Sequence, residues 1–179
     1  MPKKAAVTKK AVRGFANYAS PASGHTPKPV VKWDPSPNHA SRQGERIQQL
    51  VLHNTDGPLA GSLARLKNPV EQVSAHYVVD RTGIIYQLVA DSETAWHSGN
   101  KLVNQRSMGI EVVAWKTALG MTPAQEASLI ALAKFLLDAY SVSLSKVVPH
   151  RSIKPTDCPG WVWKDDTVLA TWKTAHLQT

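Results

Sequence analysis

Two histidines and the only cysteine of the chain stand where they can bind a metal ion together. His53 ends an apolar run that is typical of a β-strand, and His150 follows a second, shorter run of that kind. Cys158, the one cysteine among 179 residues, lies in the string TDCPG a short distance after His150. Two imidazoles and a thiolate form a tetrahedral zinc set with one corner left open. Spacing alone also fits two structural histidines and a buried thiol that packs as a small apolar side chain.

Glu111 is the candidate for a catalytic base. It lies in SMGIEVV, an otherwise apolar run, where a carboxylate is costly to bury unless it is paired or functional. In a hydrolytic site such a side chain activates the attacking water. A carboxylate at a strand end, facing solvent or bonded to an arginine, is the structural alternative.

Further polar side chains near these positions are candidates for substrate contact. They are Asn54, His76, Trp96, His97, Arg106 and Lys154. Arginine binds carboxylates through paired hydrogen bonds, which makes Arg42 a candidate as well. Each has a structural alternative, because a histidine inside a strand is more often core, Trp96 can pack, and arginines can be ordinary surface charges. His25, His39 and His176 are interpreted as structural or neutral.

Hydrophobic patterns predict the elements that must position these residues. Apolar and β-branched runs predict strands over residues 47–53, 73–80, 84–89, 107–115 and 146–148. The Arg-Thr-Gly turn between the second and third of these favours a β-hairpin. Helices are expected near residues 62–67, from 122 onward, and over 166–176. This irregular alternation predicts an α/β fold with a central mixed β-sheet flanked by helices.

The helix that follows residue 121 has the clearest start signal. Thr122 suits the N-cap, Pro123 the first helical position, and Gln125 the position where a capping box carries Glu or Gln. Apolar residues then recur at helical spacing on one face, so this helix is expected to pack on the sheet.

Composition excludes several classes of protein. With 42% hydrophobic and 19% charged residues, the chain is neither wholly disordered nor collagen-like. No apolar run approaches the roughly 20 residues of a membrane-spanning helix. The opening MPKKAAVTKK has no apolar segment behind its charges, so no secretory signal is expected. We therefore expect synthesis in the cytoplasm. A single cysteine excludes an internal disulfide.

The formal charge of +8 is concentrated near the N-terminus. Residues 1–32 carry seven Lys and Arg residues and no acidic ones, whereas residues 33–179 are nearly neutral. We therefore expect a basic, flexible extension over 1–32 and one folded domain over 33–179. Such an extension attracts anionic envelope polymers or nucleic acid through salt-sensitive forces. A solvated extension without a partner is the alternative.

Six strings follow one another along the chain: PSPNHASRQ, LVLHNT, VSAHYVVDRTGIIYQLV, AWHSG, SMGIEVV and HRSIKPTDCPG. Their order resembles that of the zinc-dependent N-acetylmuramoyl-L-alanine amidases. This group includes phage lysozyme-type amidases, bacterial murein and anhydro-muropeptide amidases, and animal peptidoglycan-recognition proteins. The resemblance runs from Trp33 to Trp163 and leaves the basic extension outside it.

The resemblance implies one zinc ion per chain, held by His53, His150 and Cys158, which ligand chemistry also selects. It implies a catalytic role for Glu111, as in the murein and anhydro-muropeptide branch. It further implies a peptidoglycan-recognition-protein fold and hydrolysis of the amide between N-acetylmuramic acid and L-alanine, in peptidoglycan or in muropeptides.

Two positions depart from the family's pattern. Phage and animal members carry a tyrosine immediately before the histidine of the hairpin strand, where this chain has Ala75. Phage lysozyme-type members carry a lysine two residues before the cysteine, where this chain has Thr156. We expect the Thr156 hydroxyl to stabilise the oxyanion, less strongly than a cation would, with Lys154 as the alternative donor.

These observations favour a monomeric phage endolysin or bacterial cell-wall amidase that acts on the cell wall. Two alternatives share the fold: a non-catalytic peptidoglycan-binding module and a cytoplasmic amidase that recycles anhydro-muropeptides. Binding of nucleic acid through the basic extension is a further alternative, compatible with catalysis.

Overall fold

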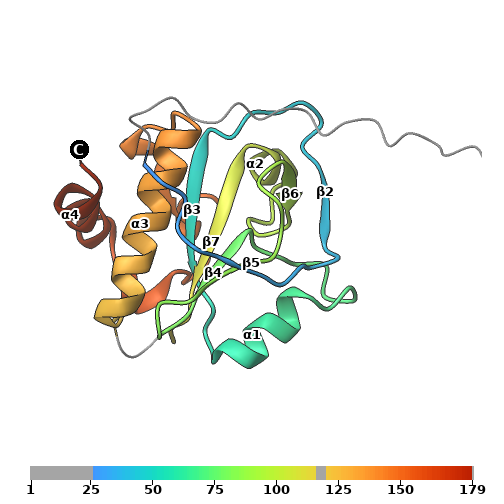
Figure 1. Ribbon diagram of the computed structural model, residues 1–179, viewed down its shortest axis with the longest axis horizontal. Coiled ribbons are helices and arrows are strands. Elements are labelled where there is room, and N and C mark those ends of the chain that lie inside the picture. The colour runs from blue at the N-terminus through green and yellow to red at the C-terminus, as the bar shows by residue number, and fades with distance from the viewer. Residues whose placement is uncertain (1–25, 116–119, 179) are drawn as a thin grey trace, which may run out of the picture.

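The structure is a computed structural model that describes residues 26–115 and 120–178. Its centre is a six-stranded mixed sheet (Figure 1). In spatial order the strands are β1 (Lys32–Trp33), β5 (Ile85–Gln87), β4 (Tyr77–Val79), β7 (Ser107–Val112), β3 (Gln49–Asn54) and β8 (Val147–Pro149). β4, β7, β3 and β8 run parallel, whereas β5 is antiparallel to β4. A second sheet pairs β2 (His39–Ser41) with β6 (Glu93–Ala95). The expected central mixed sheet is confirmed.

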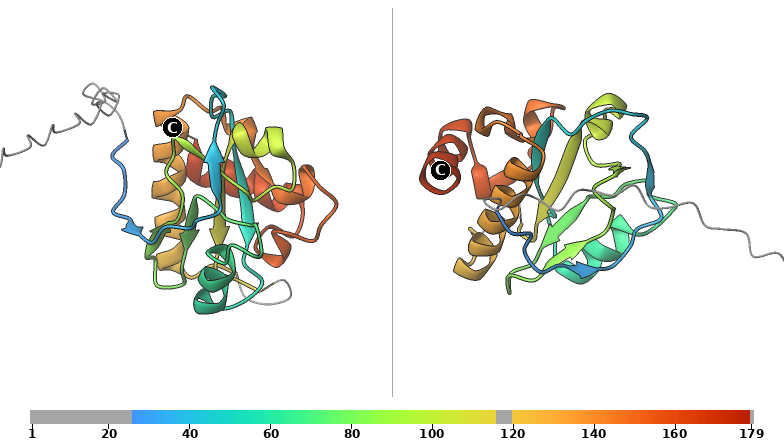
Figure 2. Two further views of the ribbon diagram at one scale, coloured as in Figure 1. Left: turned by 90° about the vertical axis from the view of Figure 1, so that its right-hand side faces the viewer. Right: turned by 45° about the horizontal axis from the view of Figure 1, so that its top comes forward.

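Helices cover both faces of this sheet. They are α1 (Leu59–Leu66), α2 (Lys101–Gln105), α3 (Pro123–Ala139) and α4 (Asp166–Leu177), with short 3₁₀ helices at Leu144–Lys146, His150–Ser152 and Gly160–Trp163. Figure 1 shows α3 and α4 on one side of the sheet and α1 on the other, and the right-hand view of Figure 2 gives the same arrangement. Each side buries its own cluster of apolar side chains.

Strand alternation decides which side chains face which layer, because successive residues point to opposite faces. Leu50, Leu52 and Ile110 belong to the cluster beneath α3. Val78 and Val113 belong to the cluster beneath α1. His53 and Glu111, one residue out of step with Leu52 and Ile110, therefore face the α1 side.

The hairpin and the long helix form where the sequence predicts them. β4 and β5 pair through an antiparallel register, and the Thr122 hydroxyl accepts a hydrogen bond from the Gln125 amide. The capping-box role expected of the Gln125 side chain is wrong. Its amide group instead donates to the carbonyls of Val79 and Val113, at 3.0 and 3.1 Å. Those carbonyls lie where two strands end, so the side chain ties α3 to the sheet.

The N-terminal boundary differs from the expected one. Residues 1–25 lie outside the described residues, so the proposed role of most of the basic extension stays a prediction. Within the described part, Lys32 already belongs to β1, paired with β5. Further upstream, the Thr26 amide donates to Asp138 at 2.6 Å and the Lys28 ammonium donates to Gln87 at 3.2 Å. The segment 26–32, expected to be flexible, therefore packs on the domain.

The turn of the hairpin requires glycine at position 83. Gly83 has a φ of +89°, and an added Cβ would lie 2.9 Å from the Ala124 carbonyl oxygen. We expect Gly83→Ala to lower the free energy of unfolding by about 1–3 kcal/mol, measured by urea denaturation. Gly44→Ala is the matched control, because Gly44 has a φ of +82° with open space around it. Equal losses in the two variants would show that the contact with α3 does not matter.

None of the described helices is long and apolar enough to cross a lipid bilayer.

Candidate metal centre

Three neighbouring strands bring a row of ionisable side chains to one edge of the sheet. β3 pairs with β7 so that His53 lies opposite Glu111. β3 also pairs with β8, ending at Leu52 opposite Pro149, so the next residues along the two strands are His53 and His150. Parallel strands end at the same edge, and residues far apart in the sequence meet there.

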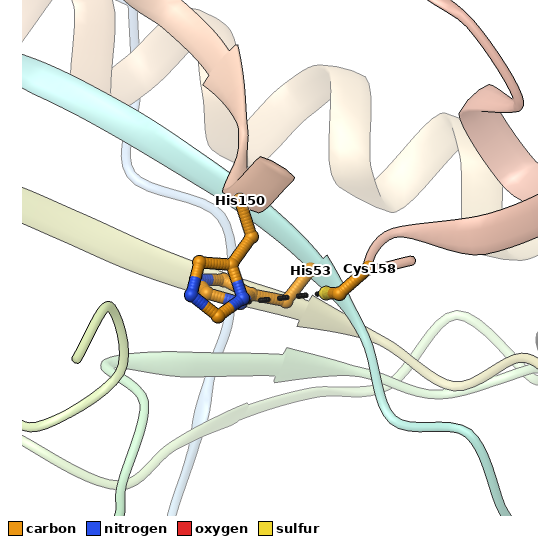
Figure 3. Close-up of side chains that lie close together, drawn as sticks. All are labelled: His53, His150 and Cys158. Atoms are coloured by element: carbon orange, nitrogen blue, oxygen red, sulfur yellow. Dashed lines mark hydrogen bonds between the residues drawn. The ribbon is translucent and has the colours of Figure 1, made fainter. Parts of the chain in front are cut away.

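Cys158 reaches the same place through a closed loop. The loop begins at His150, and its two ends are joined by a hydrogen bond of 3.0 Å from the Arg151 amide to the Cys158 carbonyl. The Cys158 Sγ then lies 3.6 Å from His53 Nδ1 (Figure 3). The ligand atoms of His53, His150 and Cys158 all lie within 4.8 Å of one another.

The donor set fits a zinc ion. Nitrogen, nitrogen and sulfur are the ligands that zinc prefers, and three protein ligands leave a fourth position open. His150 Nε2 lies 3.1 Å from the Ser98 carbonyl oxygen. A carbonyl only accepts, so His150 carries its proton on Nε2 and keeps the lone pair of Nδ1 for a metal. His150 and Cys158 are both partly exposed, so the centre is open on one side.

Burial keeps the histidines in the form that binds metals. The pKa of His53 is lowered well below its usual range, first by burial and then by repulsion from His97 and His150. Burial also lowers the pKa of His150, an effect that the Ser98 hydrogen bond partly offsets. The pKa of His97, beside His53, is likewise well below normal because of burial. Neutral imidazoles are the metal-binding species. Because these pKa values are lowered, the pH must fall further than usual before protons compete with a metal for the histidines.

Glu111 has the environment of a general base. Its Oε2 is buried and accepts no hydrogen bond from the described residues. Burial raises the pKa of its carboxyl to about 7, and the charge of Arg65 opposes part of that rise. A base works best when its pKa lies near the working pH, and Glu111 meets that condition.

The raised pKa of Glu111 predicts a pH dependence of stability in the metal-free protein. The folded-state pKa, about 7, lies above the ordinary value of 4.5, so the proton favours the folded state. This contribution is complete below pH 4.5 and is lost as the pH rises through 7. Glu111→Gln lacks this loss, so its melting temperature relative to the wild type is expected to rise between pH 5 and pH 8. Thermal unfolding by circular dichroism measures it, and a constant difference across that range would contradict it.

A cavity of about 490 Å³ opens beside the centre. It is lined by the three ligand residues and Glu111, together with Asn54, Trp96, His97, Lys154 and Thr156. Both polar atoms of the Asn54 amide are buried without a hydrogen-bond partner among the described residues. The Thr156 Oγ1 accepts a hydrogen bond from the Cys158 amide, which leaves its own hydrogen available to a substrate oxygen.

Two residues expected to contact substrate do not line this cavity. His76 is fully buried, and its Nδ1 accepts from the Gly109 amide. Its Nε2 lies 3.1 Å from the Glu93 carbonyl oxygen and 2.8 Å from the Arg42 guanidinium. Arg106 forms an ion pair with Glu45 at 2.8 Å on another part of the surface. Neither side chain is therefore placed to contact a substrate in this cavity.

Arg42 also turns away from solvent. It is buried and donates to the carbonyls of Asp91, Gln105 and Ser107. Arg42 thus satisfies backbone carbonyls of segments that are distant in the sequence and holds those segments together.

Arg65 lines the cavity and was not singled out in the sequence. It comes from the last turn of α1, the helix over the site's face of the sheet, and also approaches Glu71 at 3.6 Å. A basic residue at the end of a short helix is a common sequence feature, and nothing in its neighbours marks it as facing a cavity.

Comparison with known proteins gives a consistent result. A family model described as N-acetylmuramoyl-L-alanine amidase matches residues 43–161. The chain is 36% identical over 138 residues to N-acetylmuramoyl-L-alanine amidase AmiD of Escherichia coli, covering 64% of this chain and 49% of AmiD. It is 33% identical over 166 residues to 1,6-anhydro-N-acetylmuramyl-L-alanine amidase AmpD of Citrobacter freundii, covering 76% of this chain and 88% of AmpD.

Solved structures show the same similarity. The catalytic domain of XlyA matches with a TM-score of 0.62 at 30% identity, covering 83% of this chain and 97% of that one. A structure of AmpD matches with a TM-score of 0.66 at 26% identity, covering 79% and 93%. The match to the full sequence of XlyA from Bacillus subtilis covers only 38% of it. The chain thus spans half or less of the full lengths of AmiD and XlyA.

Proposed function

The chain belongs to the N-acetylmuramoyl-L-alanine amidase family, and from this we propose that it is a zinc-dependent hydrolase. Its substrate is the amide that joins the lactyl group of N-acetylmuramic acid to L-alanine. One observation carries the proposal: His53, His150 and Cys158 converge beside Glu111, whose buried Oε2 has no hydrogen-bond partner among the described residues. A purely structural metal site has no use for such a carboxylate.

His53, His150 and Cys158 are the residues that would hold the zinc. When bound there, zinc supplies a Lewis acid that polarises a carbonyl and lowers the pKa of water to about 7. Glu111 takes a proton from the attacking water while the water oxygen bonds to the lactyl carbonyl carbon. As the C–N bond breaks, Glu111 returns that proton to the departing L-alanine nitrogen. The products are a lactyl carboxylate and a peptide with a free α-amine.

The negative charge that develops on the carbonyl oxygen needs donors from the protein. Thr156 has a hydroxyl hydrogen free for this purpose and lines the cavity. Lys154 lines the same cavity, and its side chain lies over Gly99, where an added Cβ would sit 3.1 Å from the Lys154 Cδ. We propose that the Lys154 ammonium supplies a cationic donor beside the neutral Thr156 in this cavity.

The proposed amide occurs in two forms of substrate. A structure of AmiD from E. coli, which matches with a TM-score of 0.63 at 29% identity, holds anhydro-N-acetylmuramic acid-L-Ala-D-gamma-Glu-L-Lys as substrate. A soluble muropeptide of that kind is the first candidate substrate. Polymeric peptidoglycan, which contains the same amide between N-acetylmuramic acid and L-alanine, is the second.

Labelling of newly formed amines tests the proposal on both forms side by side. The zinc-loaded protein is incubated with a soluble anhydro-muropeptide and with purified peptidoglycan, and labelled N-terminal alanine is quantified against time. We expect new alanine amines from at least one substrate. A larger rate on the polymer would favour a cell-wall hydrolase, whereas activity confined to the fragment would favour a recycling enzyme. No alanine amine from either would overturn the proposal.

A further inference from the structure

His97 was expected to contact substrate, but its ring nitrogens are both taken by protein groups. Nδ1 lies 3.0 Å from His53 Nε2, and Nε2 lies 3.0 Å from the Ser107 hydroxyl. We propose that His97 is a positioning residue that fixes the tautomer and orientation of the metal ligand His53, under the direction of Ser107. The proposal rests on the metal-binding part of the proposed function.

The direction of each hydrogen bond follows from the far end of this chain of contacts. The Ser107 Oγ lies 2.6 Å from the Val103 carbonyl oxygen, which can only accept, so the hydroxyl hydrogen is used there. Towards His97, Ser107 can then only accept. His97 must carry its proton on Nε2.

The same logic determines the state of His53. A neutral His97 protonated on Nε2 presents a lone pair at Nδ1, so it accepts the Nε2 proton of His53. His53 is then left with a lone pair on Nδ1, the atom that lies 3.6 Å from Cys158 Sγ. The Val103 carbonyl thus selects, through two side chains, the tautomer of His53 that can bind a metal.

The fold makes room for the His97 ring at one position. An added Cβ on Gly109 of β7 would lie 2.5 Å from His97 Cγ, so the ring rests against bare backbone. The ring of His97 stands edge-on to that of His53, with an interplanar angle of 87°. The Asn104 side chain accepts from the backbone amides of His97 and Ser98, at 3.3 and 2.8 Å, and fixes the segment.

Two consecutive residues therefore hold both histidine ligands. The His97 side chain supports His53, and the Ser98 carbonyl supports His150. Metal-binding histidines usually donate their second N–H to a carboxylate, a backbone carbonyl or water, and loss of that partner costs about 10–100-fold in metal affinity. For His53 the partner is a neutral imidazole, which orients the ligand without adding negative charge.

Substitution of His97 tests the proposal. His97→Phe keeps a ring but removes the acceptor, whereas His97→Asn places an amide oxygen near the position of Nδ1. Zinc affinity is measured by competition with a chromophoric chelator, and the tautomer of His53 by ¹⁵N chemical shifts of the metal-free protein. We expect an Nε2–H tautomer for His53 in the wild type, about 10–100-fold weaker zinc binding in His97→Phe, and recovery of most of that loss in His97→Asn. His39→Phe, at an exposed histidine on β2, is the matched control and should bind zinc as the wild type does.

A second variant covers the case in which His97→Phe fails to fold. Ser107→Ala keeps both rings but removes the acceptor for His97 Nε2, together with the hydrogen bond to the Val103 carbonyl. We therefore expect a mixture of His53 tautomers and weaker zinc binding. Wild-type zinc affinity in His97→Phe or in Ser107→Ala would overturn the proposal, as would an Nδ1–H tautomer of His53 in the wild-type protein. Both readouts are independent of catalysis. If the wild type binds zinc as described but releases no alanine amine, the proposed function fails and the positioning role stands.

Discussion

Glu111→Gln is expected to lower kcat about 10²–10⁴-fold while zinc content and fold stay unchanged. The amide is close in size to the carboxyl but cannot take a proton from water. The Glu111 Oε2 has no hydrogen-bond partner among the described residues, so the substitution breaks no contact that holds the site together. The carboxyl lies beside His53 on the neighbouring strand and does not belong to the cluster of metal-binding atoms, so metal binding should persist.

Zinc content by elemental analysis and kcat by release of alanine amines give the two readouts on one preparation. Glu126→Gln is the matched control, because Glu126 lies on α3 and accepts a hydrogen bond from Trp172 outside the cavity. That variant should keep wild-type kcat. Turnover of Glu111→Gln close to that of the wild type would remove Glu111 from the mechanism.

Cys158→Ser is expected to weaken zinc binding by about a hundredfold or more and to abolish activity at limiting metal. Zinc affinities of about 10–16 kcal/mol in four-ligand peptides correspond to roughly 3 kcal/mol for each ligand, and about 1.4 kcal/mol is a factor of ten. A serine hydroxyl is a far poorer ligand than a thiolate, because it does not ionise at neutral pH. The Cys158 backbone carbonyl still closes the loop to the Arg151 amide, so the fold should remain.

Cys158→Asp is the matched control for this change. A carboxylate oxygen is itself a zinc ligand, so this variant should bind zinc more tightly than Cys158→Ser. Metal affinity is measured by chelator competition, with circular dichroism to establish folding. If Cys158→Ser binds zinc with wild-type affinity, His53 and His150 must find their third ligand elsewhere.

The sequence identifies the three residues of the candidate metal site, His53, His150 and Cys158, but not how they are arranged. His53 and His150 end apolar runs, and strand ends are places where side chains of different segments meet. The pattern cannot tell that β7, β3 and β8 are neighbours in that order, because strand order depends on long-range packing. The row of Glu111, His53 and His150 is therefore visible only in the fold.

The candidates for substrate contact show a different limit. His76 and Arg106 are polar residues near the site in sequence, but their partners come from distant segments. The His76 ring lies between Gly109 and Glu93, and Arg106 finds Glu45 across the surface. Sequence reveals that a side chain can hydrogen-bond but not which group will satisfy it. His97 lines the cavity as expected, but the sequence does not reveal that the fold also joins it to His53 and Ser107.

The short elements were the hardest to predict. β1, β2, β6 and α2 have two to five residues each, too few to establish a period. They matter to the site, because β6 precedes His97 and α2 supplies the Val103 carbonyl and the Asn104 side chain.

Mass spectrometry of the products tests the central claim most directly. Purified peptidoglycan and a soluble anhydro-muropeptide are each incubated with the zinc-loaded protein, and with the same protein after chelation. We expect zinc-dependent release of peptides that begin with a free L-alanine amine, with the bonds between sugars intact. Zinc bound at one ion per chain, with no such peptide from either substrate, would contradict the claim and leave a domain that binds without cleaving.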